Sequence, residues 1–200
     1  MFILWMGWFG FNGGSTVSMT GDDTILSVGS IMVTTNMAAA AGAVTTMLLT
    51  WVKYGKPDVS MTLNGGLAGL VAITAGTDVV SVAGSFWIGL IAGVAIVYAV
   101  EFVDQKMKID DPVGAISAHG VCGALGTILT GFFSVEDGLL YTGNPHFLMI
   151  QVLGVVVVAV YVFIAINIVF RIIKATNGLR VTREEEINGL DFEEHGLVSA

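Results

Sequence analysis

The chain has 200 residues, of which 54% are hydrophobic and only 12% are charged, and its mean hydropathy is +0.83. A soluble domain carries about 25% charged residues, so this composition excludes a soluble enzyme, a nucleic-acid-binding protein and a disordered chain. The formal net charge of −8 does not describe the apolar body, because six of the acidic residues lie in the last 17 positions.

The charged residues leave six uncharged windows of at least 19 residues each, and a membrane-spanning helix needs about 20 apolar residues. We therefore predict an all-α, polytopic membrane helix bundle of about six segments. In chain order their expected limits are about 1–18, 27–52, 60–77, 81–103, 111–133 and 147–172. The membrane domain is then 1–172, and a polar, acidic tail follows over 173–200.

The first segment ends in an aromatic and polar cluster, Trp8-Phe9-Gly10-Phe11-Asn12-Gly13-Gly14-Ser15. Aromatic rings near a membrane surface are typical of an interfacial belt. Phe11 and Ser15, however, are four positions apart and share a helix face. A ring beside a hydroxyl suits a small cation, so a belt and a binding site are both open readings of these residues.

Small and amide residues inside the middle segments predict close helix packing. Gly65-x-x-x-Gly69 and Gly89-x-x-x-Gly93 are spacings that let helix backbones approach each other. For the isolated amides we expect hydrogen bonds between helices; these residues are Asn36, Asn64 and Asn167.

The fifth segment begins at Asp110-Asp111-Pro112. Proline favours the first position of a helix, and carboxylates stabilise a helix N-terminus, so we expect a cap here.

Further along this segment, His119 is the one histidine that lies within the expected limits of the six segments. It could bond a carbonyl in the core, or it could serve function as an imidazole that donates, accepts and relays protons. His119 and Cys122 are three apart and should share a face. With a single cysteine we expect no metal site. The repeat of Gly120, Gly123 and Gly126 makes a smooth stripe that suits a neighbouring helix or a pore lumen, and we favour packing against a helix.

Basic residues set the expected orientation. All eight Lys and Arg follow the second, fourth and sixth segments: Lys53, Lys56, Lys106, Lys108, Arg171, Lys174, Arg180 and Arg183. Basic loops mark the cytoplasmic side, so the C-terminus is expected in the cytoplasm.

Three motifs now resemble those of the ammonium transporter (Amt) family. The cluster from Trp8 to Ser15 resembles the family hallmark. Asp110-Asp111-Pro112 with His119-Gly120-Val121-Cys122-Gly123 is similar to the segment that carries its second pore histidine. The third motif resembles the family's cytoplasmic tail and consists of Gly178-Leu179-Arg180-Val181 and of Gly189-Leu190-Asp191 with His195-Gly196.

The resemblance implies helices six to eleven of an eleven-helix fold, which are the second inverted repeat and the last long helix. Met1 falls where the sixth helix is already under way, so we expect a C-terminal portion of a longer protein. Phe11 would be the second ring of a phenylalanine gate, Ser15 an outer-site hydroxyl and His119 one of a histidine pair. Trp8 would support the outer vestibule. Structural or regulatory roles would fall to Asp110, Asp111, Pro112, Gly189, Asp191, His195 and Gly196.

The function implied by this resemblance is conduction of ammonium or ammonia through a hydrophobic pore, without a cofactor and without enzyme activity. Expected partners are the lipid bilayer, two further copies in a homotrimer when full length, and a PII-type regulatory protein. The alternatives are an Rh-type gas channel, an ammonium sensor and an inactive fragment. In the tail, Asn177-Gly178 predicts a helix stop, and Thr182 with Glu185 has the spacing of a capping box.

Overall fold

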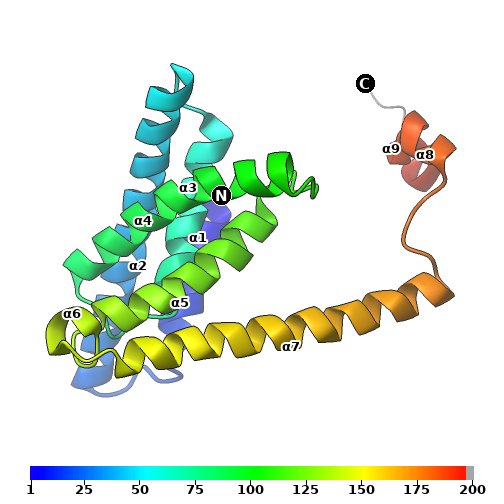
Figure 1. Cartoon of the computed structure of the whole chain (residues 1–200). Coiled ribbons are helices and arrows are strands. Elements are labelled where there is room, and N and C mark those ends of the chain that lie inside the picture. The colour runs from blue at the N-terminus through cyan, green and yellow to red at the C-terminus, as the bar shows by residue number, and fades with distance from the viewer. Residues whose placement is uncertain (197–200) are drawn as a thin grey trace. The chain divides into compact units, whose positions relative to one another are not determined.

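The computed structural model describes residues 1–196, and every regular element within them is a helix (Figure 1). The α-helices are α1 (Phe2–Gly14), α2 (Asp22–Tyr54), α3 (Val59–Ile73), α4 (Val82–Glu101), α5 (Cys122–Phe133), α6 (Leu139–Thr142), α7 (His146–Thr176), α8 (Arg183–Asn188) and α9 (Leu190–His195). Two π-helical segments are η1 (Phe102–Lys106) and η2 (Ile116–Val121). Contacts divide the chain into two compact units, 1–155 and 156–200, and α7 runs through the boundary. The predicted all-α class is confirmed.

A helix occupies each of the six predicted segments, but not all of them have the predicted length. Within the described residues, four helical stretches are long and apolar enough to cross a membrane: Asp22–Tyr54, Val82–Lys106, Ile116–Phe133 and His146–Thr176. The first and third are shorter, because α1 has 13 residues and α3 has 15. At 1.5 Å per residue, α3 is about 22 Å long, which is less than the hydrocarbon thickness of about 30 Å.

Two helix boundaries differ from the predicted ones, and local interactions explain both: hydrogen bonds in a turn after α3, and acidic residues at the start of α2. After α3 the chain turns, with the amide of Gly76 donating to Ile73 O and that of Val80 to Gly76 O. In contrast, α2 begins earlier than predicted, at Asp22. Asp22 and Asp23 occupy its first turn, where carboxylates complement the partial positive charge of a helix N-terminus.

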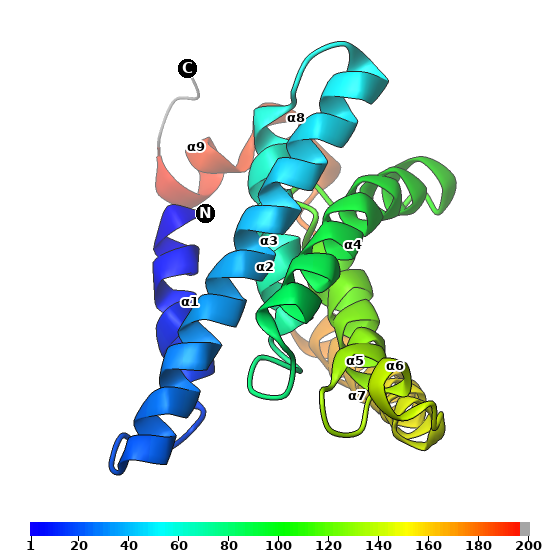
Figure 2. The same cartoon turned by 90° about the vertical axis from the view of Figure 1, so that its left-hand side faces the viewer.

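The core of the first unit is the three-helix contact of α2, α3 and α4, which lie side by side in Figures 1 and 2. Gly69 of α3 and Gly89 of α4 both face the backbone of Ala38 on α2, and neither has room for a side chain. The packing predicted from the glycine spacings is therefore confirmed.

Buried threonine hydroxyls reinforce this core. Thr46 Oγ1 donates to Gly93 O of α4 at 2.8 Å, and Thr34 Oγ1 donates to Thr77 O at 2.9 Å. Both threonines are fully buried. Hydrogen bonds of this kind stabilise helix association where water is absent.

The isolated amides follow the prediction in part. Asn36 Oδ1 on α2 accepts from Trp5 Nε1 of α1 at 3.2 Å, and Asn64 Nδ2 donates to Val113 O at 3.3 Å. Asn167 Nδ2 instead donates to Phe163 O, one turn earlier in α7, at 2.7 Å. Only Asn36 thus makes the predicted bond between helices, because a turn residue supplies the acceptor for Asn64 and its own helix supplies the acceptor for Asn167.

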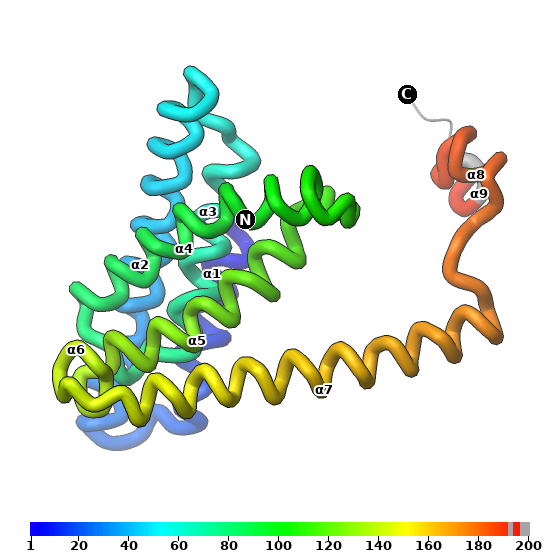
Figure 3. Tube along the Cα trace, in the orientation of Figure 1, coloured from blue at the N-terminus to red at the C-terminus, as the bar shows by residue number. Residues whose placement is uncertain are grey.

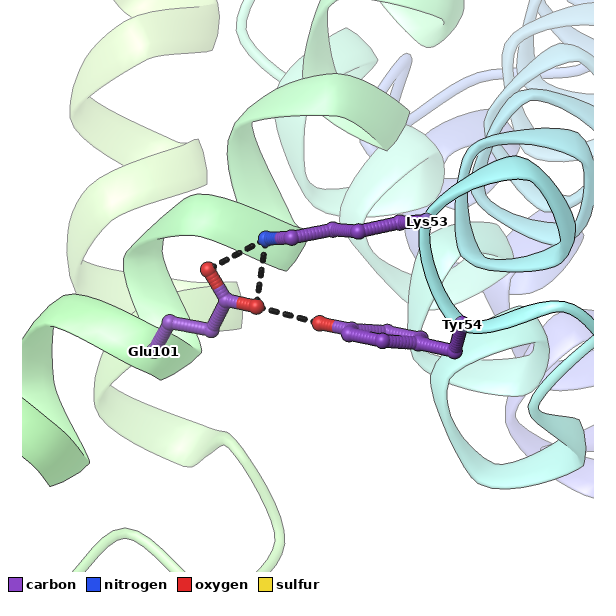
Figure 4. A network of polar contacts seen from close by, with 3 residues as sticks. All are labelled: Lys53, Tyr54 and Glu101. Carbon is purple, nitrogen blue, oxygen red and sulfur yellow. Dashed lines mark hydrogen bonds and ion pairs between the residues drawn. The ribbon is translucent and has the colours of Figure 1, made fainter.

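A polar network ties the end of α2 to the end of α4 (Figure 4). Lys53 Nζ and the Tyr54 hydroxyl both donate to the carboxylate of Glu101. Lys53 Nζ also lies 4.6 Å from the centroid of the Tyr98 ring, a cation–π distance. One carboxylate therefore holds both helix ends together.

The second unit contains the two local features predicted for the tail, and the path of its backbone through α7 and α8 can be followed in Figure 3. Helix α7 ends at Thr176, and the amides of Asn177 and Gly178 both donate to Ile173 O. Gly178 has a positive φ of 81°, as a helix-stop glycine requires. The capping box at the start of α8 is complete, with Thr182 and Glu185 bonding each other's backbone.

We expect Gly89→Ala to lower the melting temperature of the purified protein, because the added methyl would collide with the Ala38 backbone. Overpacking of this kind costs about 1–3 kcal/mol. Gly29→Ala is the matched control, since nothing lies within 4 Å of a Cβ there. Equal losses in the two variants would contradict the close-packing account.

Candidate functional site

The aromatic cluster of α1 is fixed to α3. Trp8 Nε1 donates to Thr74 Oγ1 at 2.8 Å, and the Trp8 and Phe11 rings have centroids 5.6 Å apart and planes tilted by 55°. Phe11 remains 62% exposed. Trp8 is thus anchored, while the ring of Phe11 stands on an uncovered surface. No pattern in the sequence pointed to Thr74 as the anchor.

Ser15 follows the last residue of α1 and remains exposed. Its hydroxyl donates to Phe11 O at 2.7 Å, so the oxygen is left as an acceptor. Asn12, by contrast, is buried, and its Nδ2 donates to Thr35 Oγ1 of α2 at 2.9 Å. Asn12 therefore locks the end of α1 against α2, and Ser15 presents an oxygen beside it.

His119 lies within the π-helical segment η2 and is exposed. Cys122, the first residue of α5, is fully buried. The predicted shared face of these two residues is therefore wrong. A π-helical turn holds more residues than an α-helical turn, so positions three apart no longer line up. Segments of this type are frequent at functional sites.

The three glycines after His119 also separate in space. Gly126 meets the backbone of Ala72 on α3, whereas a Cβ at Gly120 would have its nearest neighbour at 4.0 Å. Packing therefore explains Gly126, and the surface beside His119 is open around Gly120.

The side chain of Asp111 caps the start of η2. Its Oδ1 accepts from the amide of Ile116 at 3.0 Å, and its Oδ2 accepts from the amide and hydroxyl of Ser117 at 3.1 and 3.0 Å. Asp111 is buried, whereas the neighbouring Asp110 is exposed. The cap that the sequence predicted is thus supplied by one of the two carboxylates.

Pro112 does not occupy the first helical position that was predicted for it. It lies in a turn in which the amide of Gly114 donates to Asp111 O at 2.9 Å. Gly114 has a φ of 69°, which glycine adopts without strain. This turn lets the side chain of Asp111 reach over to the helix that follows.

The structure does not bring His119 into contact with the α1 cluster. Helix α1 packs on α2 and α3, whereas η2 packs on α3, α4 and α5. What Phe11, Ser15 and His119 share is exposure on the surface of the first unit. These side chains are therefore left uncovered by the part of the chain that the structure describes.

The predicted tail residues lie around α8 and α9. Gly189 separates the two helices with a φ of 89°, and Gly196 follows α9 with a φ of 65°. Asp191 is exposed, and His195 Nε2 lies 4.0 Å from a carboxylate oxygen of Glu194. The tail thus has two glycine-dependent bends.

Comparisons of the sequence and of the structure with known proteins all point to one family. The model of the Ammonium Transporter Family matches residues 1–200. The chain is 45% identical to ammonium transporter Amt2 of Archaeoglobus fulgidus, over 99% of this chain and 44% of that protein. It is 39% identical to an ammonium transporter of Aquifex aeolicus, over 97% and 45%. A solved structure described as Sensor Amt Protein has a TM-score of 0.87 and 38% identity, over 97% and 47%. The chain thus spans less than half the length of each of these proteins.

We expect Asp111→Asn to destabilise the protein, because an amide has one acceptor oxygen in place of two. The loss of a helix cap costs about 0.5–2 kcal/mol. Asp110→Asn removes the same charge from an exposed side chain, and its cost should stay within about 0.5 kcal/mol. Thermal melting of the two variants side by side checks this; equal shifts would refute the capping role of Asp111.

Proposed function

Since the chain belongs to the ammonium transporter family, we propose that it forms one wall of a membrane pore that conducts ammonium or ammonia. The observation that carries this proposal is the exposed imidazole of His119 in a membrane helix. A polar side chain facing hydrocarbon is costly, and such groups usually face a bundle interior or a water-filled cavity. In the proposal, a preceding repeat of the full-length protein covers His119 and completes the pore.

We propose that the α1 cluster is the entry site for ammonium. The oxygen of Ser15 is an acceptor for an ammonium hydrogen, and the ring of Phe11 attracts a cation through its quadrupole. Because Trp8 is anchored to Thr74, its ring holds the neighbouring ring of Phe11 in a defined place. This arrangement supports the roles that family resemblance assigns to Trp8, Phe11 and Ser15.

Conduction past this entry requires the ion to lose its charge or to have it compensated. Burial of a bare cation in an apolar lumen is prohibitive, whereas neutral ammonia crosses easily. A neutral imidazole at His119 donates through one nitrogen and accepts through the other, so it can accompany ammonia or relay its proton. Potassium can neither donate hydrogen bonds nor lose a proton to become neutral, so the pore would exclude it although its size is similar to that of ammonium.

We propose an orientation from the charge pattern. The loops over 74–81 and 134–145 contain acidic residues, the loop over 15–21 is followed directly by Asp22 and Asp23, and none of the three loops contains Lys or Arg; this end of the bundle is called the outer end below. The basic residues lie at the opposite end and in the tail, which would face the cytoplasm. The membrane domain would then be 1–172, with 173–200 as a cytoplasmic tail. A homotrimer and a PII-type partner at the cytoplasmic face belong to the same proposal.

A sensor is the second candidate, favoured by the structural similarity to the Sensor Amt Protein. A sensor binds ammonium but does not need to transport it across the membrane at the rate that metabolism requires. Uptake of labelled methylammonium by cells that express the full-length protein separates the two: sustained accumulation supports the transporter, and binding without accumulation supports the sensor.

In the full-length protein, His119→Ala should reduce methylammonium uptake by about tenfold or more, which corresponds to at least about 1.4 kcal/mol of lost barrier stabilisation. His146→Ala makes the same change at the exposed start of α7 and should leave uptake intact. Unchanged uptake and unchanged preference for ammonium over potassium in the His119 variant would refute its place in the pore.

Gly189→Asp should lower uptake while leaving the amount of protein in the membrane unchanged. Gly189 has φ 89° and ψ 138°, a region that only glycine occupies without strain, so the variant would misdirect α9. Asn188→Asp adds the same charge one residue earlier, within α8, and should preserve uptake. Full uptake after deletion of residues 177–200 would show that the tail is dispensable.

A further inference from the structure

A small polar cavity lies at the outer end of the bundle, apart from the rings of the α1 cluster. Its volume is about 170 Å³, and it is bounded by the end of α1, the first turns of α2 and the turn after α3. We propose that this cavity is a second cation site, which holds an ammonium ion behind Ser15 before the ion enters the pore. The inference rests on the proposed function and orientation.

Several groups of the lining have hydrogen-bond acceptor positions that remain unused. The hydroxyls of Ser15 and Thr16 line the cavity, and both already donate to carbonyl oxygens of α1, at 2.7 and 2.8 Å. Asn12 uses its Nδ2 to bond Thr35 Oγ1, which leaves Oδ1 as an acceptor. The remaining lone pairs suit an ion whose hydrogens are all donors, and ammonium is such an ion.

The charge of the cavity comes from Asp78. This exposed residue is part of the lining, next to the buried Thr77. A single carboxylate among neutral oxygens suits a monovalent cation. A multivalent metal is disfavoured, because the described residues contain no group of three or more His, Cys, Asp or Glu that could hold one.

The electrostatic potential around the cavity is also negative, like the charge of Asp78. Besides Asp78, the outer end carries Asp22, Asp23, Glu136 and Asp137, and all Lys and Arg lie elsewhere in the chain. Acidic surfaces raise the local concentration of cations. Salt screens exposed charges beyond about 10 Å at 0.1 M, so a carboxylate in the lining acts on a bound ion more strongly than a more distant one.

The cavity is also formed in advance and suitably small. Thr34 Oγ1 holds Thr77 O at 2.9 Å, and Thr74 Oγ1 both accepts from Trp8 and donates to Leu70 O. Each water molecule occupies about 30 Å³, so the cavity admits an ion with a few waters. It is smaller than the pockets of about 300 Å³ or more that bind organic ligands.

The test is Asp78→Asn in the full-length protein, which keeps the side-chain shape and removes the charge. We expect the methylammonium concentration at half-maximal uptake to rise about two- to fivefold, the range for the loss of one exposed ion pair, with the maximal rate unchanged. Glu136→Gln removes a charge from the same end of the bundle but from a residue outside the lining. An equal rise in both variants, or none in the Asp78 variant, would overturn the proposal.

A readout independent of transport separates this inference from the proposed function. Ammonium chloride should raise the melting temperature of the detergent-solubilised full-length protein above its value in choline chloride of equal ionic strength. Asp78→Asn should diminish that difference, and Glu136→Gln should keep it. A protein without uptake that still shows this pattern would refute the transporter while supporting the cavity. An identical ammonium response in the wild type and the Asp78 variant would refute the cavity.

Discussion

The close approach of three helix backbones at Ala38 is the constraint on which the first unit depends. Gly69 of α3 and Gly89 of α4 both meet this one residue of α2. In a membrane, helices gain little from the hydrophobic effect when they associate, so backbone proximity and hydrogen bonds must supply the stabilisation. Thr46 supplies such a bond from α2 to Gly93 O of α4, and Thr34 supplies one from α2 to Thr77 O in the turn after α3.

Helix α3 transmits this constraint to both parts of the candidate site. Thr74, just after its last residue, holds Trp8, and Asn64 in its first half holds the carbonyl of Val113 ahead of η2. Gly126 of α5 rests on the backbone of Ala72. The α1 cluster and the His119 segment do not touch, yet each is placed by hydrogen bonds and packing on the same short helix.

Charge and polarity are divided unevenly along the bundle. The outer end combines exposed carboxylates with a hydroxyl-lined cavity. At the other end, Glu101 is engaged by Lys53 and Tyr54 and serves the joining of α2 to α4 (Figure 4). At the outer end the carboxylates have no Lys or Arg neighbours within the described residues and give that surface a negative charge, whereas Glu101 at the other end is paired with Lys53.

Sequence alone determined the features that depend on nearby residues or on a repeated spacing. These were the all-α membrane class, the glycine contacts of α3 and α4, the stop at Gly178 and the capping box of Thr182 and Glu185. Tertiary structure decided the rest. The face of His119 depends on a π-helical turn, and the reach of Asp111 to Ser117 depends on the bend at Gly114. The cavity joins residues near 12, 27 and 77, which lie together only because α1, α2 and α3 pack, and no local pattern encodes that proximity.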